Sequence, residues 1–388
     1  MDSWKRKLRM GMVGGGEGAF IGGVHRIAAM LDNEVELVAG AFSRDAENSK
    51  RTGKRLYLDS NRVYGSYQEM AEQEAKLPEG DRIDFVSIVT PNSSHYDIAR
   101  TFLSAGFHVV LDKPMTFDLD QAKNLKKLVD ETGLVFALTH NYTGNAVVRE
   151  ARQLFATGKM GPVRKVVAEY LQDFLAYPHE KEGMKQAAWR VDPAQAGAGG
   201  TLGDVGSHTF NLTEYITGDK VVALCADTST FLPDRTLDED ANILVRFAGG
   251  GKGVITVSQI AIGEENALRI KAFGSKGAVN WDQENPNYLG VAYFGEPRQT
   301  FTRASGYLSE EASRVGRIPT GHPEGYLEAF ANVYVDAIEA IRAHIDGKPM
   351  DPRDYRFPTV YDGLRGMEFI VKAVESAKQG GVWLEMET

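Results

Sequence analysis

The sequence contains a single cysteine, Cys225, in 388 residues. One thiol excludes a disulfide within the chain and any metal site built from several cysteine ligands, and such scarcity is typical of a protein of the reducing cytoplasm. No run of about 18 apolar residues occurs, so no membrane-spanning helix is expected. The basic N-terminus is followed by only a few apolar residues before glycines interrupt them, which argues against a secretory signal.

Positive charge is also in short supply, with 44 Lys and Arg against 53 Asp and Glu and a formal net charge of -9. This balance argues against nucleic acid or an anionic membrane as a partner. The apolar share of 43% and the charged share of 25% are ordinary for a soluble globular protein with a full-sized core. The length predicts two domains.

The first part of the chain, residues 1–143, alternates short β-branched runs with helical patterns. Strand–helix alternation at this spacing predicts βαβ units, and therefore an α/β fold with a Rossmann-type, doubly wound parallel sheet. Helices are predicted over Ser94–Ala105 and Leu119–Thr132, each stopped by a glycine. The expected strands are Leu8–Val13, Val35–Phe42, Ile83–Val89, Phe107–Leu111 and Leu134–Leu138.

The pattern changes after a helix predicted over Asn145–Thr157. Residues 144–388 are predicted to form an α+β domain with a large, mainly antiparallel open sheet. Two long helices are expected, roughly Glu324–Ile345 and Thr359–Lys378, and the final one is a candidate to pack back onto the first domain. The expected strands are Val163–Leu171, Val221–Asp227, Ala241–Phe247, Gly253–Ile260, Ala267–Phe273 and Ala278–Trp281.

A glycine-rich segment follows the first expected strand. Gly14 and Gly16 supply G-x-G, and Ala19 takes the third small position of G-x-G-x-x-G/A, with Phe20 next to it. Glycines there permit a tight turn and the close approach of a pyrophosphate to a helix N-terminus. The alternative is a flexible glycine loop without a ligand, but the position after the first strand of a βαβ series favours a dinucleotide.

The residues after the second expected strand bear on the choice between NAD and NADP. NAD-selective sites usually carry Asp or Glu there, which binds the ribose 2′-hydroxyl. Here Ser43 and Arg44 come first, and they suit a 2′-phosphate better. The sequence therefore favours NADP, while a shifted strand end at Asp45 would restore NAD, and an ordinary solvated loop is a further alternative.

Asp204 and His208 stand four residues apart in GGTLGDVGSH. If this stretch opens a helix, both side chains project from one face about one turn apart. A carboxylate and an imidazole side by side can orient a hydroxyl and move its proton near neutral pH. The alternative is that His208 is a buried packing residue. A metal site is not indicated, because no third ligand stands at a supporting spacing.

Four segments stand in order along the chain: Gly22-Gly23-Val24-His25, Thr90-Pro91-Asn92 with His95, Asp112-Lys113-Pro114, and Gly199-Gly200 with Asp204 and His208. Together they resemble the Gfo/Idh/MocA oxidoreductases, the family of glucose–fructose oxidoreductase and inositol dehydrogenase, over essentially the whole chain. Three of these segments correspond to the family patterns G-x-x-H, Glu-Lys-Pro and G-G-x-x-x-D-x-x-x-H. The departures are about three extra residues between Gly16 and Gly22, Asp112 in place of Glu, and His140–Thr143 where many members carry Arg.

The resemblance implies an NAD(P)-dependent dehydrogenase acting on a secondary alcohol of a sugar, sugar derivative or cyclitol. Lys113, at the end of the fourth strand, would steady the reacting oxygen, His208 would exchange its proton, and Asp204 would fix a neighbouring group. It also implies a cis Lys113–Pro114 bond. Residues 144–388 would then form a substrate-binding and oligomerisation domain, whose open sheet pairs in a homodimer or homotetramer. The residues expected around the nicotinamide are Thr90, Pro91, Asn92, His95, Asp112 and Lys113.

Three further residues are candidates for the substrate pocket: Trp189, Arg190 and His322. Aromatic faces pack on sugar C–H surfaces and Arg binds hydroxyls, although a surface anchor explains the first two equally well. Two other functions compete. A dihydrodiol- or biliverdin-type reductase would need a flatter, more apolar pocket. A catalytically silent dinucleotide sensor or co-regulator should have lost Lys113 or His208, and both are present.

Overall fold

The structure is a computed structural model that describes residues 6–387. The chain divides into two compact units: the described residues up to Asn141 together with Phe330–Leu364, and Tyr142–Ala329 together with the residues from Arg365 onward. The sequence predicted one C-terminal domain over residues 144–388, and the structure differs in returning 330–364 to the first unit. In that returning segment, the hydroxyl of Tyr334 lies 2.8 Å from His25 Nδ1 and 2.9 Å from Ser87 Oγ, two buried polar residues of the first unit.

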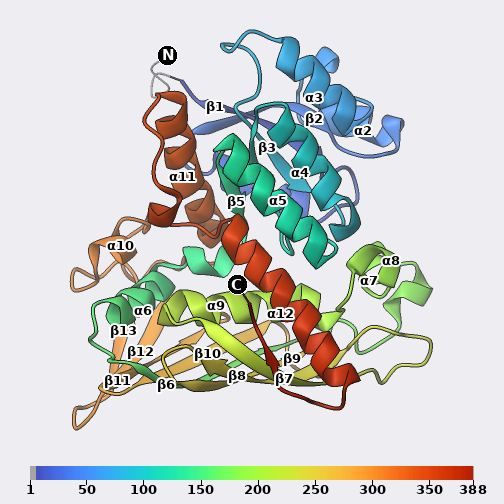
Figure 1. The fold of residues 1–388 in the computed structure, drawn as a ribbon. Coiled ribbons are helices and arrows are strands. Elements are labelled where there is room, and N and C mark those ends of the chain that lie inside the picture. Colours follow the sequence, from blue (N-terminus) through green and yellow to red (C-terminus); the bar gives the residue numbers. More distant parts are fainter. Residues whose placement is uncertain (1–5, 388) are drawn as a thin grey trace. The chain divides into compact units, whose positions relative to one another are not determined.

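The first unit is built on a five-stranded sheet in the order β2-β1-β3-β4-β5 (Figure 1). Every neighbouring pair is parallel, which confirms the Rossmann-type α/β prediction. All residues of β3 and β4 are buried, as expected where helices cover both faces of a parallel sheet. The strands are β1 (Leu8–Gly14), β2 (Val35–Ala41), β3 (Phe85–Val89), β4 (His108–Leu111) and β5 (Phe136–Leu138).

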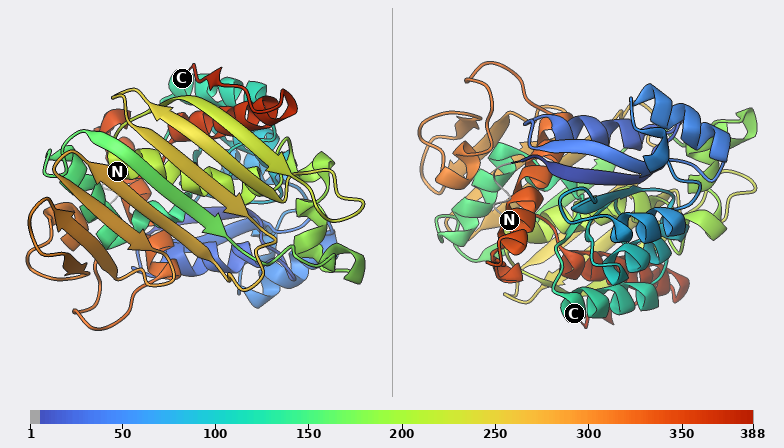
Figure 2. Two further views of the ribbon diagram at one scale, coloured as in Figure 1. Left: turned by 90° about the horizontal axis from the view of Figure 1, so that it is seen from below. Right: turned by 90° about the horizontal axis from the view of Figure 1, so that it is seen from above.

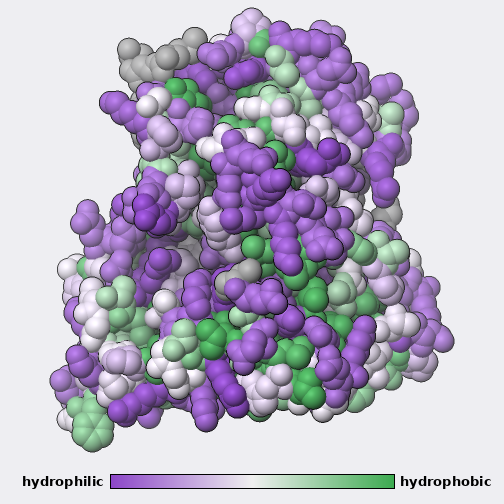
Figure 3. All heavy atoms as spheres, viewed as in Figure 1, coloured by the Kyte–Doolittle hydropathy of each residue, from purple (hydrophilic) through white to green (hydrophobic). Residues whose placement is uncertain are grey.

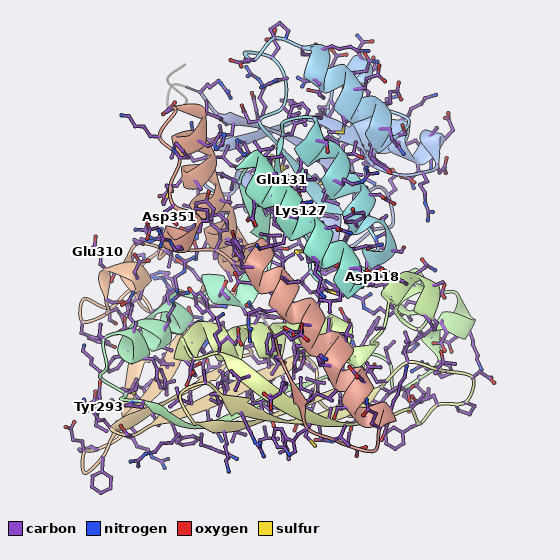
Figure 4. The ribbon with its side chains drawn as sticks, in the orientation of Figure 1. Asp118, Lys127, Glu131, Tyr293, Glu310 and Asp351 are labelled. Atoms are coloured by element: carbon purple, nitrogen blue, oxygen red, sulfur yellow. The ribbon has the colours of Figure 1, made fainter. Side chains whose placement is uncertain are left out.

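Helix α5 (Leu119–Thr132) has the predicted bounds because both ends carry local stop signals. The side chain of Asp118 accepts a hydrogen bond from the backbone N–H of Gln121, and Gly133 takes a left-handed conformation with φ 65°. Lys127 and Glu131 lie on its outer surface (Figure 4), and hydrophilic side chains gather over this helix in Figure 3. The other helices of this unit are α1 (Ile21–Met30), α2 (Ala46–Arg55), α3 (Tyr67–Lys76), α4 (His95–Ser104) and most of α11 (Tyr326–Ile345).

The second unit is built on a nine-stranded sheet in the order β13-β12-β11-β10-β6-β9-β8-β7-β14. All of its ladders are antiparallel except β6–β9, which confirms the predicted mainly antiparallel sheet. β6 has the predicted bounds, whereas β12 to β14 were not predicted. The strands are β6 (Val163–Leu171), β7 (Val221–Ser229), β8 (Asp240–Phe247), β9 (Lys252–Ser258), β10 (Ala267–Gly274), β11 (Gly277–Asp282), β12 (Tyr288–Tyr293), β13 (Gln299–Thr302) and β14 (Leu384–Glu385).

Helix α9 (Ser207–Thr217) packs on the face of this sheet formed by β6, β9 and β10 (Figure 1). The opposite face is crossed by no helix among the described residues (Figure 2, left), and β8 accordingly alternates buried and exposed residues. Within residues 6–387, no helix combines the length and the apolar character that a bilayer-spanning segment requires. The other helices are α6 (Ala146–Ala156), α7 (Lys185–Arg190), α8 (Pro193–Ala196), α10 (Glu310–Ser313) and α12 (Val360–Lys378), whose first residues up to Leu364 belong to the first unit.

A buried ion pair fastens α12 to α9. Arg365 Nη2 lies 2.6 Å from Glu214 Oε1, and both side chains are less than a tenth exposed. Replacing Glu214 with Ala leaves the guanidinium buried without its carboxylate, so we expect the free energy of unfolding to fall by about 3 kcal/mol. Denaturant unfolding measures this change.

The matched control for that experiment is Glu311→Ala, which removes a carboxylate from a partly exposed pair with Arg314. We expect a change of less than about 1 kcal/mol there. Equal losses in the two variants would contradict the stabilising role assigned to the Glu214–Arg365 pair.

Candidate active site

The glycine-rich turn between β1 and α1 forms a backbone cradle. Gly14 and Gly15 have φ of 88° and 72°, which residues with a Cβ rarely adopt. A Cβ on Gly14 would also lie 2.8 Å from Thr90 Cγ2. Phe20 precedes α1 without a side-chain cap, so the first N–H groups of the helix lack a capping side chain. This arrangement fits a pyrophosphate at a helix N-terminus.

The third small position of the turn is filled differently from the sequence prediction. Ala19 precedes α1, which begins at Ile21. The close approach is made by Gly22, where a Cβ would lie 2.3 Å from the Cα of Gly15. The assignment of that packing position to Ala19 is therefore wrong, because the longer turn delays the helix by about three residues.

The end of β2 presents Ser43 and Arg44 after the buried Phe42. Asp45 caps α2: its Oδ1 accepts a hydrogen bond of 3.0 Å from the N–H of Glu47. Since that oxygen is engaged locally, the structure does not favour Asp45 as the ribose-binding acid. The NADP preference drawn from Ser43 and Arg44 stays a prediction.

The loop after β3 carries Thr90, Pro91 and Asn92 and leads into His95, the first residue of α4. The ring of His95 is fully buried, with Nε2 2.8 Å from the carbonyl oxygen of Thr90 and Nδ1 2.9 Å from that of Pro114. Burial lowers the pKa of His95, while Asp112 and the two carbonyls oppose this shift. The histidine thus links the β3 loop to the turn that follows Lys113.

Asp112 and Lys113 directly follow β4, and the Lys113–Pro114 bond is cis, which confirms that prediction. Asp112 Oδ1 accepts hydrogen bonds from the N–H of Lys113 (2.9 Å) and from Thr139 Oγ1 (3.2 Å). Burial raises the pKa of Asp112, but the neighbouring His25, Lys113 and His95 outweigh it and bring the pKa below its usual value. A carboxylate is therefore maintained next to the lysine.

The shorter acid at position 112 leaves a gap. His25 Nε2 is buried and lies 3.9 Å from Asp112 Oδ1, beyond hydrogen-bonding distance. Asp112→Glu extends the side chain by about 1.5 Å, so we expect the carboxylate to reach this nitrogen and raise the free energy of unfolding by about 1 kcal/mol. Denaturant unfolding of this variant beside Asp112→Asn, which keeps the length and should lose stability, provides the test. A Glu variant no more stable than the wild type would contradict it.

His140 lies close to the end of the first segment of the first unit, where the charge of Lys113 acts on it. It is buried, and burial together with the charge of Lys113 lowers its pKa to about 3. The ring is consequently neutral at physiological pH. Tyr142 and Thr143, predicted in the same segment, belong to the second unit.

Asp204 lies in a π-helical turn, Leu202–Gly206, and His208 is the second residue of the α-helix that follows. The sequence predicted one regular helix here, and the structure differs because the turn is wider; such turns are frequent at functional sites. Asp204 Oδ2 accepts hydrogen bonds from Arg190 Nε (2.7 Å) and Gln259 Nε2 (2.9 Å). These two donors fix the carboxylate.

His208 is buried against aromatic rings of the same unit. Its ring centroid lies 4.9 Å from that of Tyr142, edge to face, and 6.2 Å from that of Tyr170. The two phenol oxygens are 2.7 Å apart, and Tyr170 donates a 2.7 Å hydrogen bond to Asn266 Oδ1. Burial raises the pKa of both tyrosines.

The sequence analysis missed a row of hydrogen-bonded amides that joins these two groups. Gln172 donates to Asn266 Oδ1 at 2.6 Å and accepts from Gln259 at 3.2 Å, and Gln259 in turn donates to Asp204. Gln172 and Gln259 directly follow β6 and β9, the only parallel neighbours described in this sheet, so the ends of these strands meet. The sequence did not indicate this, because the predicted strand Gly253–Ile260 included Gln259 and nothing marked the parallel pairing.

The remaining predicted residues fall in two places. Arg190 contacts Asp204 and stacks on Trp189, its guanidinium carbon 4.4 Å from the indole centroid. His322 lies exposed on a loop, where its carbonyl accepts a hydrogen bond from Arg303. Its role in binding substrate stays a prediction. In residues 6–387, no group of three or more His, Cys, Asp or Glu is arranged to hold a metal ion.

The fold and these residues define an NAD-binding α/β oxidoreductase. Residues 8–140 match the family described as "Oxidoreductase family, NAD-binding Rossmann fold", and residues 148–280 match the "GFO/IDH/MocA C-terminal domain". The chain therefore belongs to the Gfo/Idh/MocA oxidoreductase family, as the sequence motifs predicted.

Several relatives cover most of the chain. The uncharacterized oxidoreductase YfiI of Bacillus subtilis is 35% identical over 98% of both chains. An inositol dehydrogenase homolog from Azotobacter vinelandii, solved with NAD+, is 35% identical with a TM-score of 0.93 over 98% of both chains, and was also solved with NADH and myo-inositol. Levoglucosan dehydrogenase of Pseudarthrobacter phenanthrenivorans is 25% identical over 74% of this chain and 77% of its own.

Proposed function

We propose that this oxidoreductase is an NAD(P)-dependent dehydrogenase that interconverts a secondary alcohol of a sugar, sugar derivative or cyclitol with the ketone. The observation that carries the proposal is the fixed Asp204 carboxylate, with its amide neighbours, close in sequence to a buried histidine. Converging amides and carboxylates suit a ligand with several hydroxyl groups. The complex of the Azotobacter homolog with myo-inositol and the levoglucosan relative support the same substrate class.

The first unit supplies the dinucleotide site in this proposal. The Gly14–Gly16 turn and the uncapped start of α1 would hold the pyrophosphate, and the β3 loop would lie against the nicotinamide. A dinucleotide held there would supply the hydride acceptor for oxidation of the carbinol carbon and the hydride donor for the reverse reaction. Lys113 donates a hydrogen bond from its ammonium group to the substrate oxygen, which stabilises the negative charge that develops there.

The second unit supplies the proton chemistry. An imidazole nitrogen of His208 accepts the hydroxyl proton during oxidation and returns it during reduction. Tyr142 and Tyr170 hold the ring by packing, and their raised pKa values keep both phenols neutral, so neither competes as a base. Asp204, fixed by Arg190 and Gln259, accepts a hydrogen bond from a neighbouring hydroxyl and orients the substrate.

The competing enzyme function is a dihydrodiol- or biliverdin-type reductase. Such a ligand needs a flat apolar surface, and the side chains between Asp204 and Tyr170 are amides instead. A catalytically silent dinucleotide sensor is disfavoured because both Lys113 and His208 are retained. The observations therefore favour the polyol dehydrogenase.

The test is a substrate screen. Purified protein is mixed with NAD+ or NADP+ and a panel of cyclitols, aldoses and anhydrosugars, and reduction is followed at about 340 nm, with ketone forms and NADH run in reverse. We expect turnover with at least one polyol. Turnover confined to planar aromatic diols or tetrapyrroles, or none while the dinucleotide binds, would contradict the proposal. Light scattering on the same sample tests the expected homodimer or homotetramer.

A further inference from the structure

The extra residues of the glycine-rich turn form a tab, Glu17–Phe20, that is fastened to α2. The backbone N–H of Glu17 lies 3.0 Å from Asn48 Oδ1 and 3.1 Å from Thr52 Oγ1, and its carbonyl accepts a 3.2 Å hydrogen bond from Asn48 Nδ2. Backbone hydrogen bonds of this kind fix where the residue can place its side chain. The position of Glu17 is thus set by α2.

The carboxylate of Glu17 lies between two arginines on one face of α2. Its Oε2 is 3.3 Å from Arg51 Nε, and its Oε1 is 3.2 Å from Arg55 Nη1. Hydrogen bonds from both guanidinium groups lower the pKa of Glu17, so the side chain is anionic at physiological pH. Both arginines are more than half exposed, and would otherwise present cationic groups to an anionic ligand.

Gly16, directly before this tab, is hydrogen-bonded to the residue that follows β2. The N–H of Gly16 donates a 3.1 Å hydrogen bond to the carbonyl of Phe42, and Ser43 follows directly. In dinucleotide-binding folds the ribose 2′ group is recognised at the end of this strand, by an acid for NAD or by basic groups for NADP. Here Asp45 caps α2, and the glycine-rich turn brings a further acid, Glu17, against the same helix.

We propose that Glu17 selects against the 2′-phosphate of NADP, and so replaces the acidic residue that NAD-specific members of this fold place after β2. The carboxylate repels the phosphate, which carries a charge of about −2, and it neutralises Arg51 and Arg55, which would otherwise bind that phosphate. This inference rests on the dinucleotide site of the proposed function. It predicts the opposite cofactor preference from the one drawn from Ser43 and Arg44.

The test measures dinucleotide binding alone and needs no substrate. Titration of the full-length protein with NADH and with NADPH, followed by nicotinamide fluorescence, gives both Kd values. We expect the wild type to bind NADH at least about tenfold more tightly. Glu17→Gln keeps the size and removes the charge, so NADPH binding should tighten about tenfold while NADH binding changes less than about threefold.

Two further variants separate the proposed effect from a general change in surface charge. Glu47→Gln removes a carboxylate of α2 that pairs with Lys50, and the NADH-to-NADPH ratio should stay within about twofold of the wild type. Adding Arg51→Gln to Glu17→Gln should abolish the gain for NADPH.

The outcomes distinguish the inference about Glu17 from the proposed dehydrogenase function. A wild-type preference for NADPH, or an unchanged ratio in Glu17→Gln, overturns the inference about Glu17 while leaving the dehydrogenase intact. Failure of the wild type to bind either dinucleotide overturns the proposed function itself.

Discussion

Lys113→Met is expected to lower kcat about 10³-fold with the best substrate of the screen. The variant keeps the length and packing of the side chain but removes the ammonium group that stabilises charge on the substrate oxygen, and loss of one such donor typically costs 10²–10³ in rate. Because Lys113 acts in the transition state, KM should change by less than about fivefold. Steady-state kinetics with NAD+ measures both values.

The control for Lys113 is Lys127→Met, which removes an exposed lysine on the outer surface of α5 (Figure 4). It should leave both constants within about twofold, since surface charges far from a reacting group contribute little. Retained turnover in Lys113→Met would remove this lysine from the mechanism. Loss of NADH binding in the variant would instead indicate a role in holding the cofactor.

His208→Gln is the second substitution with a large expected effect. We expect kcat/KM to fall about 10²- to 10⁴-fold near neutral pH. Glutamine can still donate and accept hydrogen bonds but cannot accept the substrate proton. The wild type should lose oxidation activity as the pH falls, because a protonated imidazole is no longer a base. The variant should lack this decline, so the complete pH profile distinguishes loss of a base from loss of structure.

His179→Gln, which alters a partly exposed histidine of the same unit paired with Glu182, is the matched control and should keep the wild-type profile. Thermal unfolding is needed alongside, since His208 packs on Tyr142. If oxidation activity still falls at low pH in His208→Gln, the proton transfer must be assigned to another group.

The elements that the sequence located best carry local signals at their ends. Helix α5 matched its predicted bounds because Asp118 and Gly133 cap it, and no distant contact is needed to place either end. The glycine-rich turn and the cis Lys113–Pro114 bond were equally accessible, the first from glycine spacing and the second from the family resemblance.

What the sequence could not show depends on distant partners or on small changes of helical pitch. His25 Nδ1 lies 2.8 Å from the hydroxyl of Tyr334, which is 309 residues further along the chain. No local pattern predicts that contact, and for this reason α11 was placed in the wrong unit. The π-helical turn around Asp204 adds one residue to a turn, a change that apolar spacing does not register.

The return of residues 330–364 to the first unit has a consequence for biosynthesis. A ribosome releases the five parallel strands early, yet Tyr334 and Arg342, whose guanidinium donates a hydrogen bond to the backbone carbonyl of Arg6, emerge only after strands β6 to β13 of the second sheet. Until residues 330–364 have been made, the first unit lacks the contacts that the hydroxyl of Tyr334 makes with His25 and Ser87. The order of the chain therefore couples completion of the first unit to synthesis of the second unit.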